Sequence, residues 1–147
     1  MRNRELAGDY VRRAEARLLA LDVLFEAESW ADVVRESQEV VELALKGLLQ
    51  ACGVEAPRIH DVSEILLAER ARLPAVLHGE LKRLGQISRD LRRDRELAFY
   101  GSNDLVPTSF YTEADAVEAR DGARLTVRLV LPHVPRKGGR SDSARGS

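Results

Sequence analysis

The sequence is poor in cysteine, in aromatic residues and in net charge. Its single cysteine, Cys52, excludes an internal disulfide framework and a cysteine-cluster zinc site. Aromatic residues make up only 5% of the 147 residues, so a core must be mainly aliphatic, built from Leu, Val and Ala. Leucine and alanine are strong helix formers, whereas strands prefer β-branched and aromatic residues. The composition therefore favours helices over sheets.

Long apolar runs are also missing. The N-terminus has no uninterrupted apolar stretch of signal-peptide length, and no run approaches the roughly 20 apolar residues of a membrane span. We therefore expect a cytoplasmic protein with no membrane partner. The formal net charge of −1 does not indicate a globally basic nucleic-acid binder, although it permits a local basic patch.

Apolar residues recur three and four positions apart through most of the chain, which is the spacing of one helix face. This pattern predicts an all-α fold, an antiparallel helical bundle of four long helices plus one short helix. We expect one domain over residues 1–134 and a disordered polar tail over 135–147. The long helices are predicted to cover about 5–28, 30–52, 75–99 and 113–134, with the short one before Pro74.

Helix ends are marked by residues that favour caps. Ser29, Asp61 and Thr112 are predicted N-caps, and Gly53 is a predicted C-terminal stop. The first two helices are joined tightly, so they should form an antiparallel hairpin. Gly122 should weaken the last helix locally. The expected inner face of the first helix consists of Leu6, Tyr10, Ala14, Leu18, Leu21 and Phe25.

Complete catalytic motifs are absent from the sequence. The three histidines, His60, His78 and His133, lie far apart without ligand spacing, so we expect no metal and no cofactor. Neither a nucleophile-elbow motif nor a phosphate-binding loop occurs, which leaves acyl transfer and nucleotide hydrolysis without support. Cys52 is expected to be a small buried apolar residue, because no neighbour in the sequence would lower its pKa.

The stretch RDLRRDRELAFYG, residues 89–101, is the most informative one. It holds four arginines followed by Tyr100, and arginines beside a tyrosine at a helix end are able to hold a phosphate or stack on a base. The alternative is a solvated face of ion pairs, such as Arg92 with Glu96 four residues on, and spacing alone favours it. The candidate ligand-binding residues are Arg89, Arg92, Arg93, Arg95 and Tyr100.

Three segments in this order resemble the HEPN family (higher eukaryotes and prokaryotes nucleotide-binding domains). They are SWADVVRESQEVVELALKGLLQACG, then HDVSEILL, then RDLRRDRELAFYG with the following loop and TEADAVEA. The likeness covers roughly the first 134 residues. It implies a helical bundle and, in many members, metal-independent ribonuclease activity.

The ribonuclease motif of the family is an arginine, a polar residue, and a histidine after four to six positions. In the toxin members of HEPN–MNT pairs a tyrosine follows two residues beyond the histidine. Arg93, Asp94 and Tyr100 match this motif, but the histidine position falls on Ala98, and other registers place Phe99 or Tyr100 there, never a histidine. The resemblance makes Arg93 and Tyr100 the candidate catalytic residues, and the missing histidine argues against cleavage because alanine transfers no proton.

The resemblance also implies partners. Family members commonly form homodimers that bring two motifs together, and in HEPN–MNT pairs a nucleotidyltransferase can modify the family tyrosine, here Tyr100. Our leading hypothesis is a degenerate HEPN protein that binds RNA or nucleotide as a dimer in a toxin–antitoxin or defence system. The alternatives are an active metal-independent endoribonuclease, with Arg93 assisted by Tyr100 or Arg95, and a structural partner subunit without a ligand.

Overall fold

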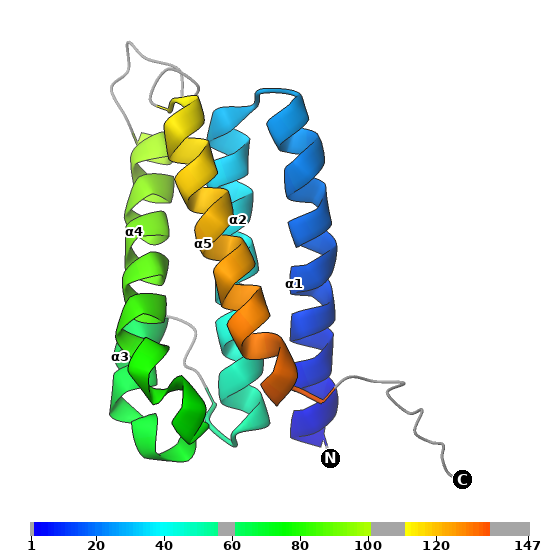
Figure 1. Ribbon diagram of the computed structural model, residues 1–147, viewed down its shortest axis with the longest axis vertical. Coiled ribbons are helices and arrows are strands. Elements are labelled where there is room, and N and C mark those ends of the chain that lie inside the picture. Colours follow the sequence, from blue (N-terminus) through cyan, green and yellow to red (C-terminus); the bar gives the residue numbers. More distant parts are fainter. Residues whose placement is uncertain (1, 56–60, 101–110, 136–147) are drawn as a thin grey trace, which may run out of the picture.

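The computed structural model describes the backbone over residues 2–55, 61–100 and 111–135, and side chains over 4–55, 61–93 and 111–135. The predicted all-α fold is confirmed: the described ranges form helices without strands (Figure 1). The tail from residue 136 on, the region of His60 and the loop 101–110 lie outside them. The helices are α1 (Arg2–Glu26), α2 (Trp30–Ala51), α3 (Val62–Ala68), η1 (Arg70–Arg72), η2 (Ala75–Glu80), α4 (Leu81–Tyr100), α5 (Glu113–Val130) and η4 (Leu131–His133).

The second helix, α2, is the centre of the bundle. It packs against α1, α3, α4 and α5, and most of its residues are buried. Leu45, Leu48 and Leu49 are completely inaccessible to solvent, as the broad apolar stripe of this helix predicts. The first two helices form the predicted antiparallel hairpin, and α5 crosses in front of α2 (Figure 1).

The inner face of α1 differs from the predicted stripe. Leu6 is 43% exposed, whereas the buried positions are Ala7, Val11, Ala14 and Leu21. The cause is a close approach at Gly47 of α2, where a Cβ atom would lie 2.8 Å from Val11 Cγ2 and 3.2 Å from the Ala7 carbonyl oxygen. The absence of a side chain at Gly47 therefore sets which side of α1 faces the core.

The fourth predicted helix is really two segments. Residues 75–80 form the 3₁₀ helix η2, and the α-helix begins only at Leu81. Short 3₁₀ turns are frequent at helix N-termini. Here the His78 ring contacts the Leu73 carbonyl oxygen through Nε2 at 3.0 Å, which holds the chain across the break at Pro74.

The caps are of two kinds. Gly53 has a φ of 79°, as expected of a glycine after a helix, and Asp61 accepts a hydrogen bond from the Ser63 amide. Ser29 makes no side-chain bond to the backbone, and its hydroxyl donates instead to the Asp32 carboxylate at 2.6 Å. Ser29 is thus the N-cap residue of α2, as predicted, but its side chain is turned toward the Asp32 carboxylate and caps no backbone amide.

Thr112 and Asp115 form a complete capping box at the start of α5. We expect Thr112→Ala to lower the free energy of unfolding by about 1 kcal/mol, because it leaves a helix-end amide without its acceptor. Urea denaturation followed by circular dichroism measures this. Thr112→Ser keeps the hydroxyl and serves as the control, and equal losses in both variants would contradict a capping role.

Candidate functional site

Three arginines of α4 converge with the N-terminus of α3. Arg89, Arg92 and Arg93 lie within five residues of one another on α4, so the helix places them around one side. Together they border a hollow of about 350 Å³. Its full lining is Asp61, Gln86, Arg89, Asp90, Arg92 and Arg93.

The ion pairs in this hollow are long. Arg92 Nη1 lies 3.7 Å from Asp61 Oδ1, and Arg93 Nη2 lies 3.8 Å from Asp90 Oδ1. Both distances exceed those of charge-assisted hydrogen bonds, which are about 2.7–2.9 Å. These two carboxylates therefore lie beyond hydrogen-bond distance of the arginines, and the side chain of Arg93 is 68% exposed.

Arg89 is held by a neutral group. Its Nη2 donates to Gln86 Oε1 at 2.7 Å, and Gln86 Nε2 in turn donates to Asp90 Oδ1 at 2.8 Å. This chain fixes the direction of the Arg89 guanidinium through an uncharged amide, which does not neutralise it. A phosphate entering the hollow would thus meet positioned donors.

A polar row on α2 lies within electrostatic reach of Arg92. Burial would raise the pKa of Glu42, but hydrogen bonds from Gln38 and Lys46, together with the positive charges of Lys46 and Arg92, outweigh it and lower that pKa. Glu42 Oε1 accepts from Gln38 Nε2 at 2.7 Å, and Glu42 Oε2 lies 3.1 Å from Lys46 Nζ. A depressed carboxyl pKa contributes stability above about pH 4.5, which is lost as pH falls through the folded-state pKa.

The remaining candidates lie in the last turns of α4. Its backbone is continuous from Arg93 to Tyr100, seven positions apart, so the helix places these two on the same side. Ala98, expected from the sequence to stand at the position of the family histidine, belongs to the same continuous helix. The side chains of Arg95, Ala98 and Tyr100 lie outside the described residues, as does that of Glu96. The described partner of Arg92 is Asp61.

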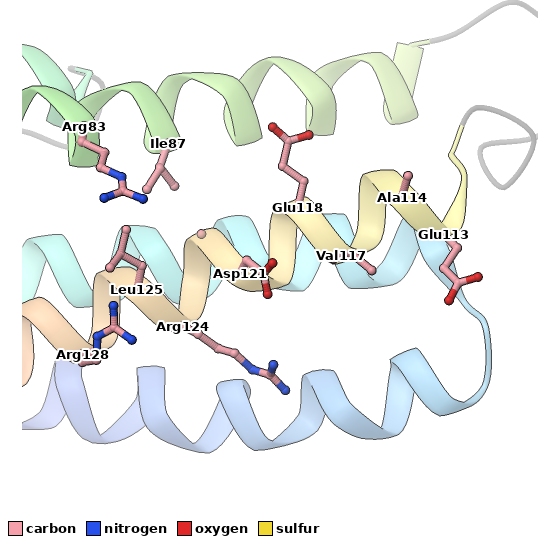
Figure 2. A pocket seen from close by; sticks show the side chains of 11 residues that line it. Arg83, Ile87, Glu113, Ala114, Val117, Glu118, Asp121, Arg124, Leu125 and Arg128 are labelled. Carbon is pink, nitrogen blue, oxygen red and sulfur yellow. The ribbon is translucent and has the colours of Figure 1, made fainter.

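A larger groove of about 940 Å³ runs along the line between α4 and α5. Figure 2 shows Arg83 and Ile87 reaching from α4 toward α5, with Leu125 reaching back between them. Arg83 and Arg128 lie at one end of the groove and Glu113 and Glu118 toward the other, whereas Arg124 extends toward α1, where it pairs with Asp22 at 2.9 Å. The groove therefore combines an apolar floor with opposite charges along its length.

Gly122 lets α5 approach α4 beside this groove. A Cβ atom there would lie 3.0 Å from Ile87 Cγ2, so a larger side chain would push the helices apart. A smaller hollow lined by Ile87, Gly122 and Arg93, among others, continues the groove along α4. Arg93 also lines the hollow that it shares with Arg89 and Arg92, here called the arginine hollow. It therefore lies where that hollow meets the groove between α4 and α5.

Other catalytic chemistry finds little support in the described residues. No group of three or more His, Cys, Asp or Glu side chains is placed there to hold a metal ion. Burial raises the pKa of the Cys52 thiol, and the nearby Arg72 offsets this only in part. Cys52 is therefore a poor nucleophile at neutral pH. Within the same ranges, no helix combines the length and apolarity needed to cross a membrane.

A family model described as "HEPN domain" matches residues 7–132. The chain belongs to the HEPN family. Searches of curated proteins and of solved structures returned no match. The family is one of nucleotide-binding and ribonuclease-type domains, and the match runs from within α1 past the end of α5, so it includes the hollow lined by the three arginines.

The sequence of this HEPN domain predicts its arginines but not their surroundings. Asp61 stands out in the sequence only as a helix cap, yet its carboxylate both caps α3 and faces Arg92. No spacing rule links positions 61 and 92, because their contact depends on how α3 packs against α4. The signal in the sequence that could have suggested this contact is the capping role of Asp61, because a capping carboxylate can still accept a hydrogen bond from a second group.

Proposed function

We propose that this HEPN domain binds RNA or a nucleotide through the arginines of α4. The observation that carries this proposal is the convergence of Arg89, Arg92 and Arg93 on one hollow, where Asp61 lies 3.7 Å from Arg92, Asp90 lies 3.8 Å from Arg93 and Arg89 donates to an uncharged amide. A phosphate group forms shorter, bidentate contacts with arginine and would displace such loose pairs.

The same site is degenerate as a nuclease. Metal-independent cleavage in the family needs a histidine for proton transfer, and Ala98 occupies its position. The backbone of α4 is continuous from Arg93 to Tyr100, and the other registers that the motif spacing allows would place Phe99 or Tyr100 at the histidine position, so none of them supplies a histidine. Binding without cleavage is the activity that an arginine cluster lacking a proton donor supports.

A second copy of the chain is the proposed occupant of the groove between α4 and α5. Its apolar floor would be covered by that copy, and its separated charges would be matched if the copies meet antiparallel. Arg93 borders the extension of this groove, so pairing there would bring two arginine hollows onto one face. The resulting basic surface would exist despite the net charge of −1.

The cellular partner we propose is an MNT-type nucleotidyltransferase in a toxin–antitoxin or defence system. This rests on the resemblance of Arg93, Asp94 and Tyr100 to the motif of the toxin members of such pairs. Tyr100 is then the residue that the partner would modify. Mass spectrometry of Tyr100 after incubation with that enzyme and ATP tests the assignment, with Tyr100→Phe as the control.

We expect Arg93→Ala to weaken RNA binding about tenfold, the order of one hydrogen bond between charged groups. The slope of log affinity against log salt should fall by about 0.7 for a single strand, because one phosphate contact is lost. Fluorescence anisotropy with a labelled oligonucleotide at several salt concentrations measures both. The matched control is Arg35→Ala on α2, since Arg35 forms a similar pair with Asp32 at 3.8 Å.

The same two variants separate the alternatives. Equal affinity in wild type, Arg93→Ala and Arg35→Ala would contradict the binding site and favour a structural partner subunit. Cleavage of RNA in EDTA by wild type, lost in Arg93→Ala, would contradict the degenerate site and establish an active endoribonuclease. Cleavage that persists in Arg93→Ala would point to a contaminating nuclease.

A further inference from the structure

Two carboxylates line the arginine hollow, although a phosphate has no use for them. Asp61 and Asp90 contribute to its wall beside Arg89, Arg92 and Arg93. A carboxylate repels a phosphate and so weakens its binding to nearby arginines. Mixed charges suit a ligand that offers hydrogen-bond donors as well as acceptors, and the edges of nucleobases carry both. The lining therefore suits a base and its phosphate together better than a phosphate alone.

The carboxylate of Asp61 is fixed in direction by its own helix. As the N-cap of α3, it accepts a hydrogen bond from the Ser63 amide at Oδ1, at 3.0 Å, and its side chain is 27% exposed. The two oxygens of a carboxylate provide about four acceptor positions. In the part of the chain that the structure describes, the Ser63 amide is the one group that donates to Asp61 within hydrogen-bond distance. This carboxylate is therefore both positioned and able to accept further hydrogen bonds.

Arg92 stands beside this carboxylate without bonding to it. Its Nη1 lies 3.7 Å from Asp61 Oδ1, and its side chain is 38% exposed. The two residues belong to different helices, α3 and α4, which pack on each other, so the fold keeps an acceptor and a donor side by side. Both residues line the hollow. A ligand that enters it therefore meets a pair of acceptor oxygens next to a fork of donors.

Guanine is the base whose edge matches this arrangement best. Its N1–H and N2–H groups are adjacent donors, which suit the two oxygens of one carboxylate, and its O6 and N7 are adjacent acceptors, which suit a guanidinium. Adenine and cytosine each offer one amino group on their pairing edge, and uracil offers one N–H. Each of these three would leave a carboxylate oxygen without a donor, and a polar group removed from water without a partner costs binding free energy.

We propose that the arginine hollow binds a guanine base, with Asp61 accepting from N1–H and N2–H and Arg92 donating to O6 and N7. This inference rests on the proposed binding of RNA or a nucleotide and adds the base that is recognised. The hollow of about 350 Å³ lies at the lower end of the roughly 300–1,000 Å³ of small-ligand sites, which suits a single base. Arg93, whose side chain is 68% exposed, contacts the adjoining phosphate.

Fluorescence anisotropy of the full chain with short labelled uridine strands tests the preference. A strand with one central guanine should bind about tenfold more tightly than the same strand with adenine, within the range of one bidentate base contact. Inosine lacks the N2 amino group and 7-deazaguanine lacks the N7 acceptor, so each should lose part of this gain. Equal affinity for strands with guanine, adenine or uracil at the centre would overturn the proposal.

The variant Asp61→Asn assigns the preference to this carboxylate. Asparagine is also a good N-cap, so α3 should keep its start and the circular dichroism spectrum should not change, while an amide donor replaces one acceptor oxygen. We expect the tenfold preference for guanine over adenine to disappear. The matched control is Asp32→Asn, since Asp32 forms a similarly long pair with Arg35 on α2, and this variant should keep the preference. A guanine preference that survives in Asp61→Asn would overturn the assignment.

Titration with GMP, AMP and IMP separates the two sources of the base. Tighter binding of GMP, lost in Asp61→Asn, would place the base of a free nucleotide in the hollow. A guanine preference seen with strands alone would identify RNA as the ligand, because neighbouring phosphates are then required. Failure of wild type to bind any strand or nucleotide would refute the proposed function itself. Binding through Arg93 without a preference among bases would refute the guanine site and leave that function standing.

Discussion

Ala98→His should give this HEPN domain metal-independent cleavage of RNA, about 10²–10⁴ times faster than the wild-type background, which is the usual contribution of a general acid or base. The reason is that α4 already places Arg93 five positions earlier on the same continuous helix. Histidine titrates near neutral pH and can exchange a proton with the attacking 2′-hydroxyl, which alanine cannot. Cleavage of a fluorogenic RNA in EDTA measures the gain.

Two variants decide how a gain is interpreted. Ala98→Gln has similar bulk and polarity without a proton to transfer at neutral pH, so it should stay at background. Ala98→His combined with Arg93→Ala should lose most of the activity, because no cation then stabilises the phosphoryl charge. If Ala98→His binds RNA normally but cleaves no faster than Ala98→Gln, the alignment of Ala98 with the family histidine is refuted.

Leu48→Ala should lower the free energy of unfolding by about 2–5 kcal/mol, the usual cost of emptying a buried leucine site. Leu48 is fully buried on α2, the helix that contacts all the other main helices, so the surrounding side chains cannot collapse easily into the space. Because domains are stable by only about 5–15 kcal/mol, this change should be plain in urea denaturation.

The matched control is Leu67→Ala on α3, where the leucine is 48% exposed and its truncation leaves no enclosed cavity. We expect Leu67→Ala to lower the free energy of unfolding by at most about half as much as Leu48→Ala, since much of the Leu67 side chain is already in water. Similar losses in the two variants would contradict the central role of α2 in the core.

Features that depend on local sequence could be predicted well. The all-α class follows from the recurrence of apolar residues, and Thr112 with Asp115 forms the capping box that its spacing indicates. Gly53 adopts the positive φ expected after a helix. In each case the residues that determine the structure lie within one or two turns of one another, so their interaction is present in the sequence itself.

Features that depend on packing between distant segments could not be predicted. The exposure of Leu6 follows from how closely α1 approaches Gly47, and periodicity places a helix face only to within a residue. The contact between Arg92 and Asp61 exists because α3 packs on α4. The candidate site is therefore recognisable in the sequence as a group of arginines with Asp90 among them, whereas the approach of Asp61 is a property of the tertiary fold.

The position of α5 across α2 has a consequence for how the chain is made. The hairpin of α1 and α2 closes through a tight local connection, whereas α5 reaches α2 only after the whole of α3 and α4. Contacts between distant segments form late, because the chain loses the entropy of closing a long loop before the contact stabilises it. During synthesis, the side of α2 that α5 covers must therefore stay open to solvent until α5 leaves the ribosome. The partly synthesised chain, with this apolar side of α2 exposed, is therefore the form most prone to aggregate or to be bound by a chaperone.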